Sequence, residues 1–224
     1  MGEVKKVLLL IGSPKIKEST SASIGRYLLE KLKNKKMLVE ELHINSELKT
    51  EQKEAEFLEK VEKSDLIILS FPLYIDSIPA YTIRALEKIA EKRMKTENKN
   101  SQNLIAICNC GFPESSQNNI AIEICEEFAK KAEIGWLGGL AIGMGGAING
   151  QELNKLGGMV RNIKKGLDLV VESIIKGEKI SKKAIEYVGR PSIPNCLYIF
   201  MGNISWISTA LKNKVFKKLG NRPY

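Results

Sequence analysis

Histidine is nearly absent from this chain, which has 224 residues, one histidine and four cysteines. Zinc and iron–sulfur sites take about four cysteine or histidine ligands, so a metal centre would be hard to assemble. Four cysteines with this spacing also make no disulfide framework. We therefore predict neither a metal site nor disulfide bonds, and we interpret His43, in a predicted strand, as a structural residue.

Long apolar segments are missing as well. The first apolar run, residues 7–11, is too short for the core of a secretory signal. No stretch of the sequence is long and apolar enough to span a bilayer. With 43% hydrophobic and 27% charged residues, the composition is typical of a globular protein with a substantial core. We expect a cytoplasmic location.

Acidic residues are absent from the C-terminal end. From residue 190 to residue 224 there are six lysines or arginines and no aspartate or glutamate, so this segment carries +6 of the net charge of +9. The small excess of positive charge in the remaining body gives no argument for nucleic-acid binding. We predict a domain of residues 1–188 and a C-terminal extension of residues 189–224.

Two kinds of apolar pattern alternate along the predicted domain. Short β-rich runs, several of them apolar throughout, are typical of strands buried on both faces of a parallel sheet. Between them, apolar residues recur every three or four positions, which indicates amphipathic helices. The alternation predicts an α/β fold, a doubly wound five-stranded parallel sheet with helices on both faces. The predicted strands are residues 7–11, 37–44, 65–71, 103–110 and 139–145.

The segment GSPKIKESTS, residues 12–21, follows the first predicted strand. It has neither of the patterns G-x-x-x-x-G-K-[ST] and G-x-G-x-x-G, because the next glycine after Gly12 is Gly25. A helix that begins near Ser19 would still offer free N–H groups to an anion. The hydroxyl groups and the lysine suit a terminal phosphomonoester such as that of FMN, and a plain helix cap is the alternative. The candidate phosphate ligands are Ser13, Lys15, Ser19, Thr20 and Ser21.

Two further loops follow predicted strands, FPLYIDSIPA at residues 71–80 and CNCGFPESSQ at residues 108–117. With the first loop, they resemble the NAD(P)H-dependent FMN reductases and quinone reductases of flavodoxin-like fold, over about residues 4–175. The resemblance implies FMN as the cofactor and NAD(P)H as the hydride donor. It implies that Pro72, Leu73, Tyr74 and Ile75 border the flavin ring and ribityl chain, and that the loop of Asn109, Cys110, Gly111 and Phe112 contacts the pyrimidine side.

Some of these features have a plainer interpretation. Tyr74 also fits a packing tyrosine, and Cys110 fits a redox thiol, although no base stands beside it in the sequence. Residues 135–158 hold nine of the 18 glycines. They fit either a loop near the flavin that admits nicotinamide or an acceptor, or a close-packed last strand with a loose turn.

The extension contains an apolar and aromatic segment, residues 196–211, whose side chains require cover. We expect it to pack on the body or on the partner subunit of a homodimer. A lid over the flavin is one alternative. The other is an amphipathic membrane-surface segment, which is the one route by which we expect any membrane association.

No side chain stands out as a catalytic acid, base or nucleophile, so we name no catalytic residue. Hydride transfer to a flavin requires none. The sequence therefore predicts an FMN-binding oxidoreductase that passes a hydride from NAD(P)H to the flavin and electrons to a quinone or another small-molecule electron acceptor. The alternative is a non-enzymatic electron carrier of flavodoxin type, which the basic pI of about 9.3 disfavours, because such carriers are usually acidic.

Overall fold

The computed structural model describes residues 4–15, 18–97 and 100–221. The chain forms two compact units, Met1–Ser192 and Ile193–Tyr224. The first unit contains the sheet and its helices, and the second contains one long helix. The division therefore lies a few residues beyond the boundary expected from the sequence.

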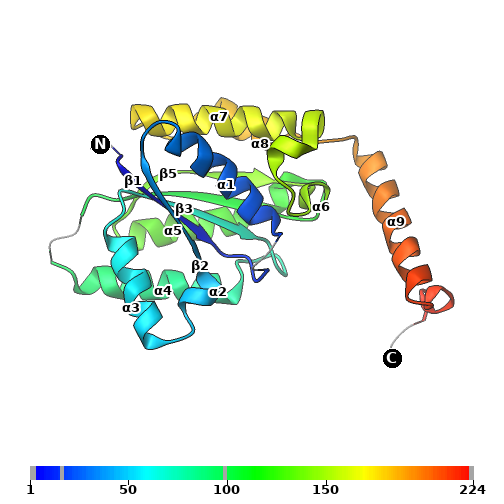
Figure 1. Cartoon of the computed structure of the whole chain (residues 1–224), viewed down its shortest axis with the longest axis horizontal. Helices are drawn as coiled ribbons and strands as arrows, with labels where there is room; N and C mark the ends of the chain where they lie inside the picture. The colour runs from blue at the N-terminus through cyan, green and yellow to red at the C-terminus, as the bar shows by residue number, and fades with distance from the viewer. Residues whose placement is uncertain (1–3, 16–17, 98–99, 222–224) are drawn as a thin grey trace. The chain divides into compact units, whose positions relative to one another are not determined.

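The first unit is built on a five-stranded sheet in which all pairs of strands are parallel (Figure 1). Its strand order is β2-β1-β3-β4-β5. The chain changes direction across the sheet between β1 and β3, which is the switch point of the flavodoxin-like order. The predicted fold class is confirmed. The strands are β1 Lys6–Ile11, β2 Leu38–His43, β3 Leu66–Pro72, β4 Asn103–Asn109 and β5 Gly135–Ile142.

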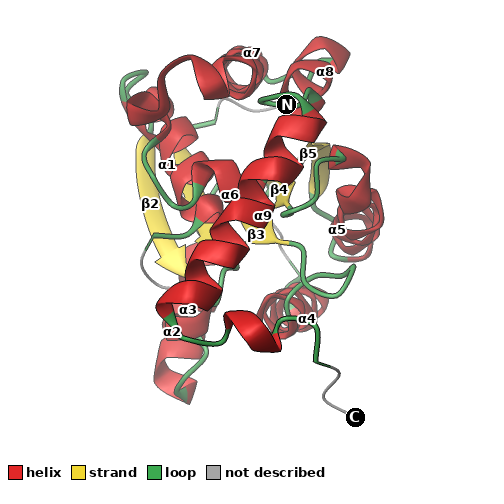
Figure 2. Ribbon diagram, turned by 90° about the vertical axis from the view of Figure 1, so that its right-hand side faces the viewer, coloured by secondary structure: helices red, strands yellow, loops and turns green. Residues whose placement is uncertain are grey.

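Helices cover both faces of the sheet (Figure 1). Successive side chains of a strand point to opposite faces, so Leu9 of β1 packs in the core beneath α1 and α7, and Leu8 packs in the core beneath α3, α4 and α5. Figure 2 shows the two layers from a second direction, with α7 and α8 on one side of the strands and α3 and α4 on the other. The helices are α1 Thr20–Lys33, α2 Ile44–Glu47, α3 Glu51–Glu62, α4 Ala80–Lys95, α5 Asn119–Lys131, α6 Gly145–Ile148, α7 Arg161–Lys176 and α8 Lys182–Gly189, with the 3₁₀ segments η1 Ser115–Asn118 and η2 Leu153–Val160.

The last strand begins and ends earlier than the sequence pattern indicates. It was expected at residues 139–145, and it is found at Gly135–Ile142. Its glycines allow a close approach to α5, since a Cβ atom at Gly139 would lie 2.2 Å from Cγ2 of Ile122. The glycines that allow this packing are also typical of loops, so the sequence pattern does not indicate that the strand begins at Gly135.

The second unit, described by itself, consists of α9, Asn195–Lys212, and the short 3₁₀ segment η3, Phe216–Lys218. The apolar segment that was noted in the sequence forms most of α9. Within the described part of the chain, we find no helix with the length and apolar character needed to cross a bilayer.

Candidate functional site

A pocket of about 200 Å³ lies at the carboxyl ends of β1, β3 and β4. In open α/β sheets, this edge near the switch point is where ligands bind. All three loops that the sequence singled out contribute to the pocket, and a fourth loop after β5 joins them. The pocket is lined by Ser13, Lys15, Thr20, Pro72, Leu73, Tyr74, Asn109, Cys110, Gly111, Gly145, Gly146 and Asn149.

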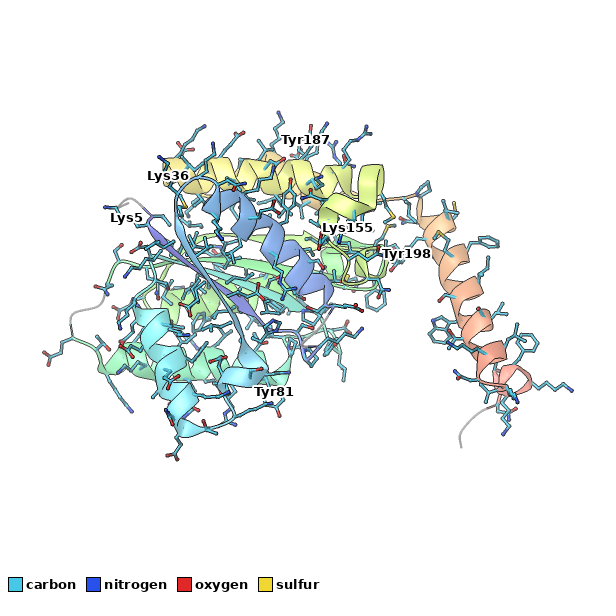
Figure 3. The ribbon with its side chains drawn as sticks, in the orientation of Figure 1. Lys5, Lys36, Tyr81, Lys155, Tyr187 and Tyr198 are labelled. Atoms are coloured by element: carbon cyan, nitrogen blue, oxygen red, sulfur yellow. The ribbon has the colours of Figure 1, made fainter. Side chains whose placement is uncertain are left out.

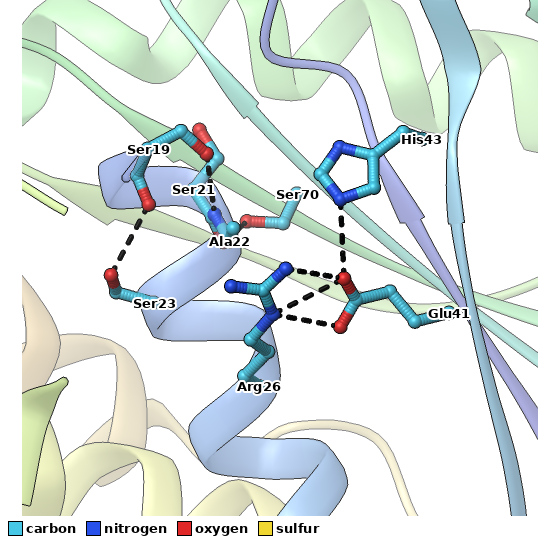
Figure 4. A network of polar contacts seen from close by, with 8 residues as sticks. All are labelled: Ser19, Ser21, Ala22, Ser23, Arg26, Glu41, His43 and Ser70. Atoms are coloured by element: carbon cyan, nitrogen blue, oxygen red, sulfur yellow. Dashed lines mark hydrogen bonds and ion pairs between the residues drawn. The ribbon is translucent and has the colours of Figure 1, made fainter. Parts of the chain in front are cut away.

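The hydroxyl residues of the first loop divide into two groups. Ser19 is the N-cap of α1, and its hydroxyl oxygen accepts a hydrogen bond from the N–H of Ala22 at 3.1 Å (Figure 4). Ser21 is also buried, and its carbonyl oxygen accepts from the hydroxyl of Ser70 at 2.8 Å. Neither residue lines the pocket, whereas Thr20 does. Ser19 and Ser21 therefore support the loop rather than face the pocket.

The second loop contains a strained turn beside the pocket. Tyr74 and Ser77 exchange two backbone hydrogen bonds of 3.0 Å, and between them Ile75 and Asp76 have φ angles of 49° and 55°. Two successive left-handed residues are typical of a tight hairpin turn, but a β-branched residue is disfavoured there. Ile75 is fully exposed at the tip and does not line the pocket, unlike Pro72, Leu73 and Tyr74. Such strain is concentrated at ligand-binding sites.

The third loop, after β4, presents backbone and a buried thiol to the pocket. The Cys110 sulfur accepts from Nδ2 of Asn118 at 3.3 Å, and it lies 3.7–3.8 Å from the carbonyl oxygens of Glu114 and Phe112. Burial raises the pKa of the Cys110 thiol and outweighs these contacts. The thiol is therefore poorly suited to act as a nucleophile. Phe112 is half exposed and does not line the pocket.

The fourth loop was not among the candidate site residues, although its glycine content was the signal for it. Gly145 approaches the third loop so closely that a Cβ atom would lie 3.0 Å from the Cys110 carbonyl oxygen. The Gly145 carbonyl oxygen accepts from the Thr20 hydroxyl at 3.0 Å. Gly150, with a φ of 75°, passes close to the backbone of Glu18, where a Cβ atom would lie 2.1 Å from the carbonyl oxygen. Glycine thus lets this loop close over the first one.

The polar groups of the pocket fit a phosphomonoester. Among the described residues that line it, Lys15 is the one charged residue, and none of them is a carboxylate or a histidine. The hydroxyl-bearing residues Ser13 and Thr20 lie with it at the start of α1, whose N–H groups and dipole favour an anion. Tyr74, 44% exposed, supplies a flat aromatic surface at the same pocket. The donor set therefore suits a ligand with an anionic end and a planar end, as FMN has.

His43 lies away from the pocket, in a network at the edge of the sheet (Figure 4). Its Nε2 atom is 3.2 Å from Oε1 of Glu41, and that carboxylate also accepts two short bonds from the Arg26 guanidinium, at 2.6 and 2.9 Å. Burial would raise the pKa of Glu41, but the bonds from Arg26 lower it below the ordinary value. His43 therefore lies in a network of the edge strand, outside the candidate site, and its structural role stays a prediction. Among the described residues, we find no cluster of side chains that could hold a metal ion.

Solved structures of similar fold include two enzymes and a flavodoxin. An NADH:FMN oxidoreductase in its apo form is 11% identical, with a TM-score of 0.56 over 85% of this chain and 96% of that one. An FMN-dependent NADH-azoreductase from Bacillus anthracis str. Ames Ancestor, in complex with FMN, is 12% identical, with a TM-score of 0.55 over 76% and 99%. A flavodoxin from Streptococcus pneumonia TIGR4 is 11% identical, with a TM-score of 0.52 over 77% and 99%. At such identities the likeness shows the fold alone.

Among curated proteins, none matches this sequence. A family model described as flavodoxin-like fold matches residues 5–119, just over half of the chain. The matched residues include β1, β3 and β4 and the three loops that follow them. With this match and the strand order β2-β1-β3-β4-β5, the chain belongs to this family of flavodoxin-like fold.

Proposed function

We propose that this protein is an FMN-binding oxidoreductase that takes a hydride from NAD(P)H and passes electrons to a quinone or another small acceptor. The observation that carries the proposal is the pocket, where three loops that resemble those of FMN reductases meet, and where the described lining includes Lys15 and no carboxylate. Fold neighbours named as an NADH:FMN oxidoreductase and an FMN-dependent NADH-azoreductase support it.

In this proposal, each loop has a separate task. Ser13, Lys15 and Thr20 hold the terminal phosphate at the start of α1. Tyr74 lies against the planar ring of the flavin. The backbone of Gly111 lies near the polar edge of that ring, because the space at the Cβ position of Gly111, with no protein atom within 4 Å, is open to the ligand. Bound FMN would supply the redox chemistry, and the chain would bind and orient it.

The described residues that line the pocket form no proton relay of side chains. Its titratable lining residues are Lys15, Tyr74 and Cys110, and the raised pKa of the Cys110 thiol keeps it protonated at neutral pH. This lining is consistent with hydride transfer to a flavin, which requires no acid or base from the protein. Hydrolysis or acyl transfer, which rely on an activated nucleophile, would find no such group among the lining residues.

A flavodoxin-type electron carrier is the second candidate. The TM-score of 0.52 with a flavodoxin favours it, whereas the net charge of +9 disfavours it. An enzyme oxidises NAD(P)H with a small acceptor and no other protein, but a carrier requires a partner protein. A cytoplasmic location stays a prediction for either function.

The test uses the purified full chain. We expect FMN to bind more tightly than riboflavin, measured by quenching of flavin fluorescence, because a charge-assisted phosphate contact contributes about 1.5–3 kcal/mol. The loaded protein should then oxidise NADH or NADPH when a quinone, nitroaromatic or azo compound is added. Equal affinity for riboflavin would overturn the phosphate site. Flavin binding without NAD(P)H oxidation by any acceptor would favour the carrier.

A further inference from the structure

An apolar groove lies between α4 and α5, in the helical layer opposite α1 and α7. Its volume of about 440 Å³ exceeds that of the candidate site pocket. Ile120 is 62% exposed, and Ile83 and Ile124 are about 40% exposed. Exposed apolar side chains that line one groove make it a candidate interaction site. The apolar lining consists of Ile83, Leu86, Ala90, Ile120, Ile124 and Phe128.

The groove is acidic although the protein is basic. Of the described residues, Glu87, Glu123 and Glu127 line it with one cation, Lys131, and Glu127 also lies 3.8 Å from Lys130. Two cations of α4 pair with α3 instead of the groove: Lys88 lies 3.2 Å from Glu54, and Arg84 lies 3.7 Å from the same carboxylate. The groove therefore offers an apolar floor with a negative rim, and it fits an apolar segment that carries positive charge.

The helix α9 has that character. Five apolar side chains recur on it with alternating spacings of three and four residues, the spacing of a seam that packs between helices, and the exposed Ile199, Met201 and Trp206 extend its apolar surface beyond this seam. A helix that lies on a lipid surface also presents a strongly charged face, whereas α9 has one charged residue, Lys212, at its end. No acidic residue occurs in the second unit, and further lysines follow the helix. The seam residues, each between 43% and 61% exposed, are Leu197, Phe200, Ile204, Ile207 and Leu211.

We propose that α9 of one copy of this chain lies in the groove between α4 and α5 of a second copy. Each copy has both a groove and a seam. In a dimer with two-fold symmetry the same contact forms twice, so that both grooves and both seams are covered. The lysines at and after the end of α9, Lys212, Lys214, Lys217 and Lys218, then meet the glutamates of the groove. The interaction does not depend on bound flavin, and it predicts a homodimer.

Charge reversal on each side tests the contact in the full-length protein. The groove variant is Glu123→Lys with Glu127→Lys, and the tail variant is Lys214→Glu with Lys217→Glu. We expect each to raise the dimer dissociation constant at least tenfold by sedimentation velocity, and we expect the four changes in one chain to restore it to within about threefold, because opposite charges again face each other.

The matched control is Glu126→Lys with Glu186→Lys, which makes the same charge change at exposed positions outside the groove. It should leave dimerisation unchanged. Circular dichroism and FMN titration establish that each variant folds and binds flavin as before, so that failure of the dimer is separate from failure of the proposed function. A monomeric wild-type chain, or a dimer that neither charge reversal affects, would overturn the proposal.

Two further experiments test the alternatives, in which α9 docks within its own chain or binds a lipid surface. After mixing isotope-labelled with unlabelled protein and cross-linking, we expect peptides that join α9 of one isotopic form to α5 of the other. Cross-links confined to single copies would overturn the proposal in favour of docking within one chain. Binding of the full-length protein to phosphatidylserine vesicles that Ile207→Asp abolishes, with no dimer in solution, would overturn it in favour of a lipid surface.

Discussion

The side-chain amide of Asn109 donates a hydrogen bond of 2.8 Å to Oγ of Ser21, and so joins the end of β4 to the first turn of α1. The same Nδ2 atom donates to the carbonyl oxygen of Phe71 near the end of β3 at 3.0 Å. One buried amide therefore connects the three elements that carry the pocket loops. Ser21, which the sequence assigned to phosphate, contributes to the site through this amide.

The first prediction concerns this amide. Asn109→Ala removes both donated bonds from a buried place, and we expect a loss of about 1–3 kcal/mol in the free energy of unfolding. FMN affinity should fall as well, since the three loops lose their common support. The matched control is Asn103→Ala at the other end of β4, which should destabilise the fold and leave FMN affinity unchanged. Thermal unfolding measures the change in stability, and flavin titration measures the change in FMN affinity. If Asn109→Ala and Asn103→Ala lose FMN affinity equally, Asn109 does not support the pocket loops specifically.

The second prediction separates the phosphate from the ring. Lys15→Gln should lower FMN affinity about tenfold, because a charge-assisted contact to phosphate is lost, and should leave riboflavin affinity unchanged. The control Lys33→Gln removes the same charge at the far end of α1 and should change neither affinity. The difference in FMN affinity between the wild-type protein and Lys15→Gln should be smaller at high salt, because salt screens an exposed charge pair. A parallel loss of riboflavin binding would remove Lys15 from the phosphate site.

The third prediction compares two glycines of the site loops. A Cβ atom at Gly12 would lie 2.3 Å from Oγ1 of Thr82 and 2.9 Å from Cβ of Phe71. Gly12→Ala should therefore cost about 1–3 kcal/mol of stability through overpacking. A Cβ atom at Gly111 would meet no atom within 4 Å, so Gly111→Ala should be nearly neutral for stability. Because Gly111 lines the pocket, its variant should instead weaken FMN binding, and unchanged binding would place the ring elsewhere.

The fourth prediction concerns the four thiols. Burial raises the pKa of Cys125 to about 12, and it raises the pKa values of Cys108 and Cys110 above the ordinary value. At pH 8 these buried groups stay protonated and shielded, whereas Cys196 is exposed. We expect one rapid reaction with an aromatic disulfide reagent in the native protein and four in guanidinium. A second rapid thiol that Cys110→Ser removes would show that Cys110 is reactive after all.

The sequence predicted the sheet well because its central strands carry a strong signal. In β1, β3 and β4 nearly every side chain is buried, and continuous apolar runs are easy to recognise. At the edge strand β5 the exposed and buried positions mix with glycine, so its start was missed. In the last helical pattern, the spacing of Leu156 and Val160 from Ile163 in the sequence predicts that these two residues lie in the same helix as Ile163. They lie in η2 instead, because Gly157 breaks the helix with a φ of 56°.

Side-chain orientation limited the prediction of the site. Ser19, Thr20 and Ser21 are equivalent in the sequence, and the structure turns one of them to the pocket and uses the other two as supports. Likewise, the spacing of Tyr81 from Ile78 in the sequence predicts that Tyr81 lies in the core, but its side chain is 53% exposed on α4 (Figure 3). Periodicity gives the face of a helix within about one position, so residues at the margin of an apolar stripe are assigned less reliably.

The last prediction concerns the strained turn. Ile75 has a φ of 49° and a fully exposed side chain. A left-handed conformation costs an ordinary residue about 1–2 kcal/mol, whereas asparagine tolerates it. Ile75→Asn should therefore raise the melting temperature of the flavin-free protein by about 2–4 °C. The control Ile185→Asn, at an exposed position in the helix α8, has no such strain to relieve and should give no increase.

The resemblance to FMN reductases places Ile75 beside the flavin, whereas the described lining of the pocket does not include it. FMN affinity of the same Ile75→Asn variant decides between the two, because loss of a contact with the ring should weaken binding several-fold. Natural sequences retain strain of this kind where binding or catalysis requires it. A more stable variant with weaker FMN binding is the expected result. Unchanged stability would show that the turn relaxes without cost, and unchanged FMN affinity would show that the tip lies away from the bound flavin.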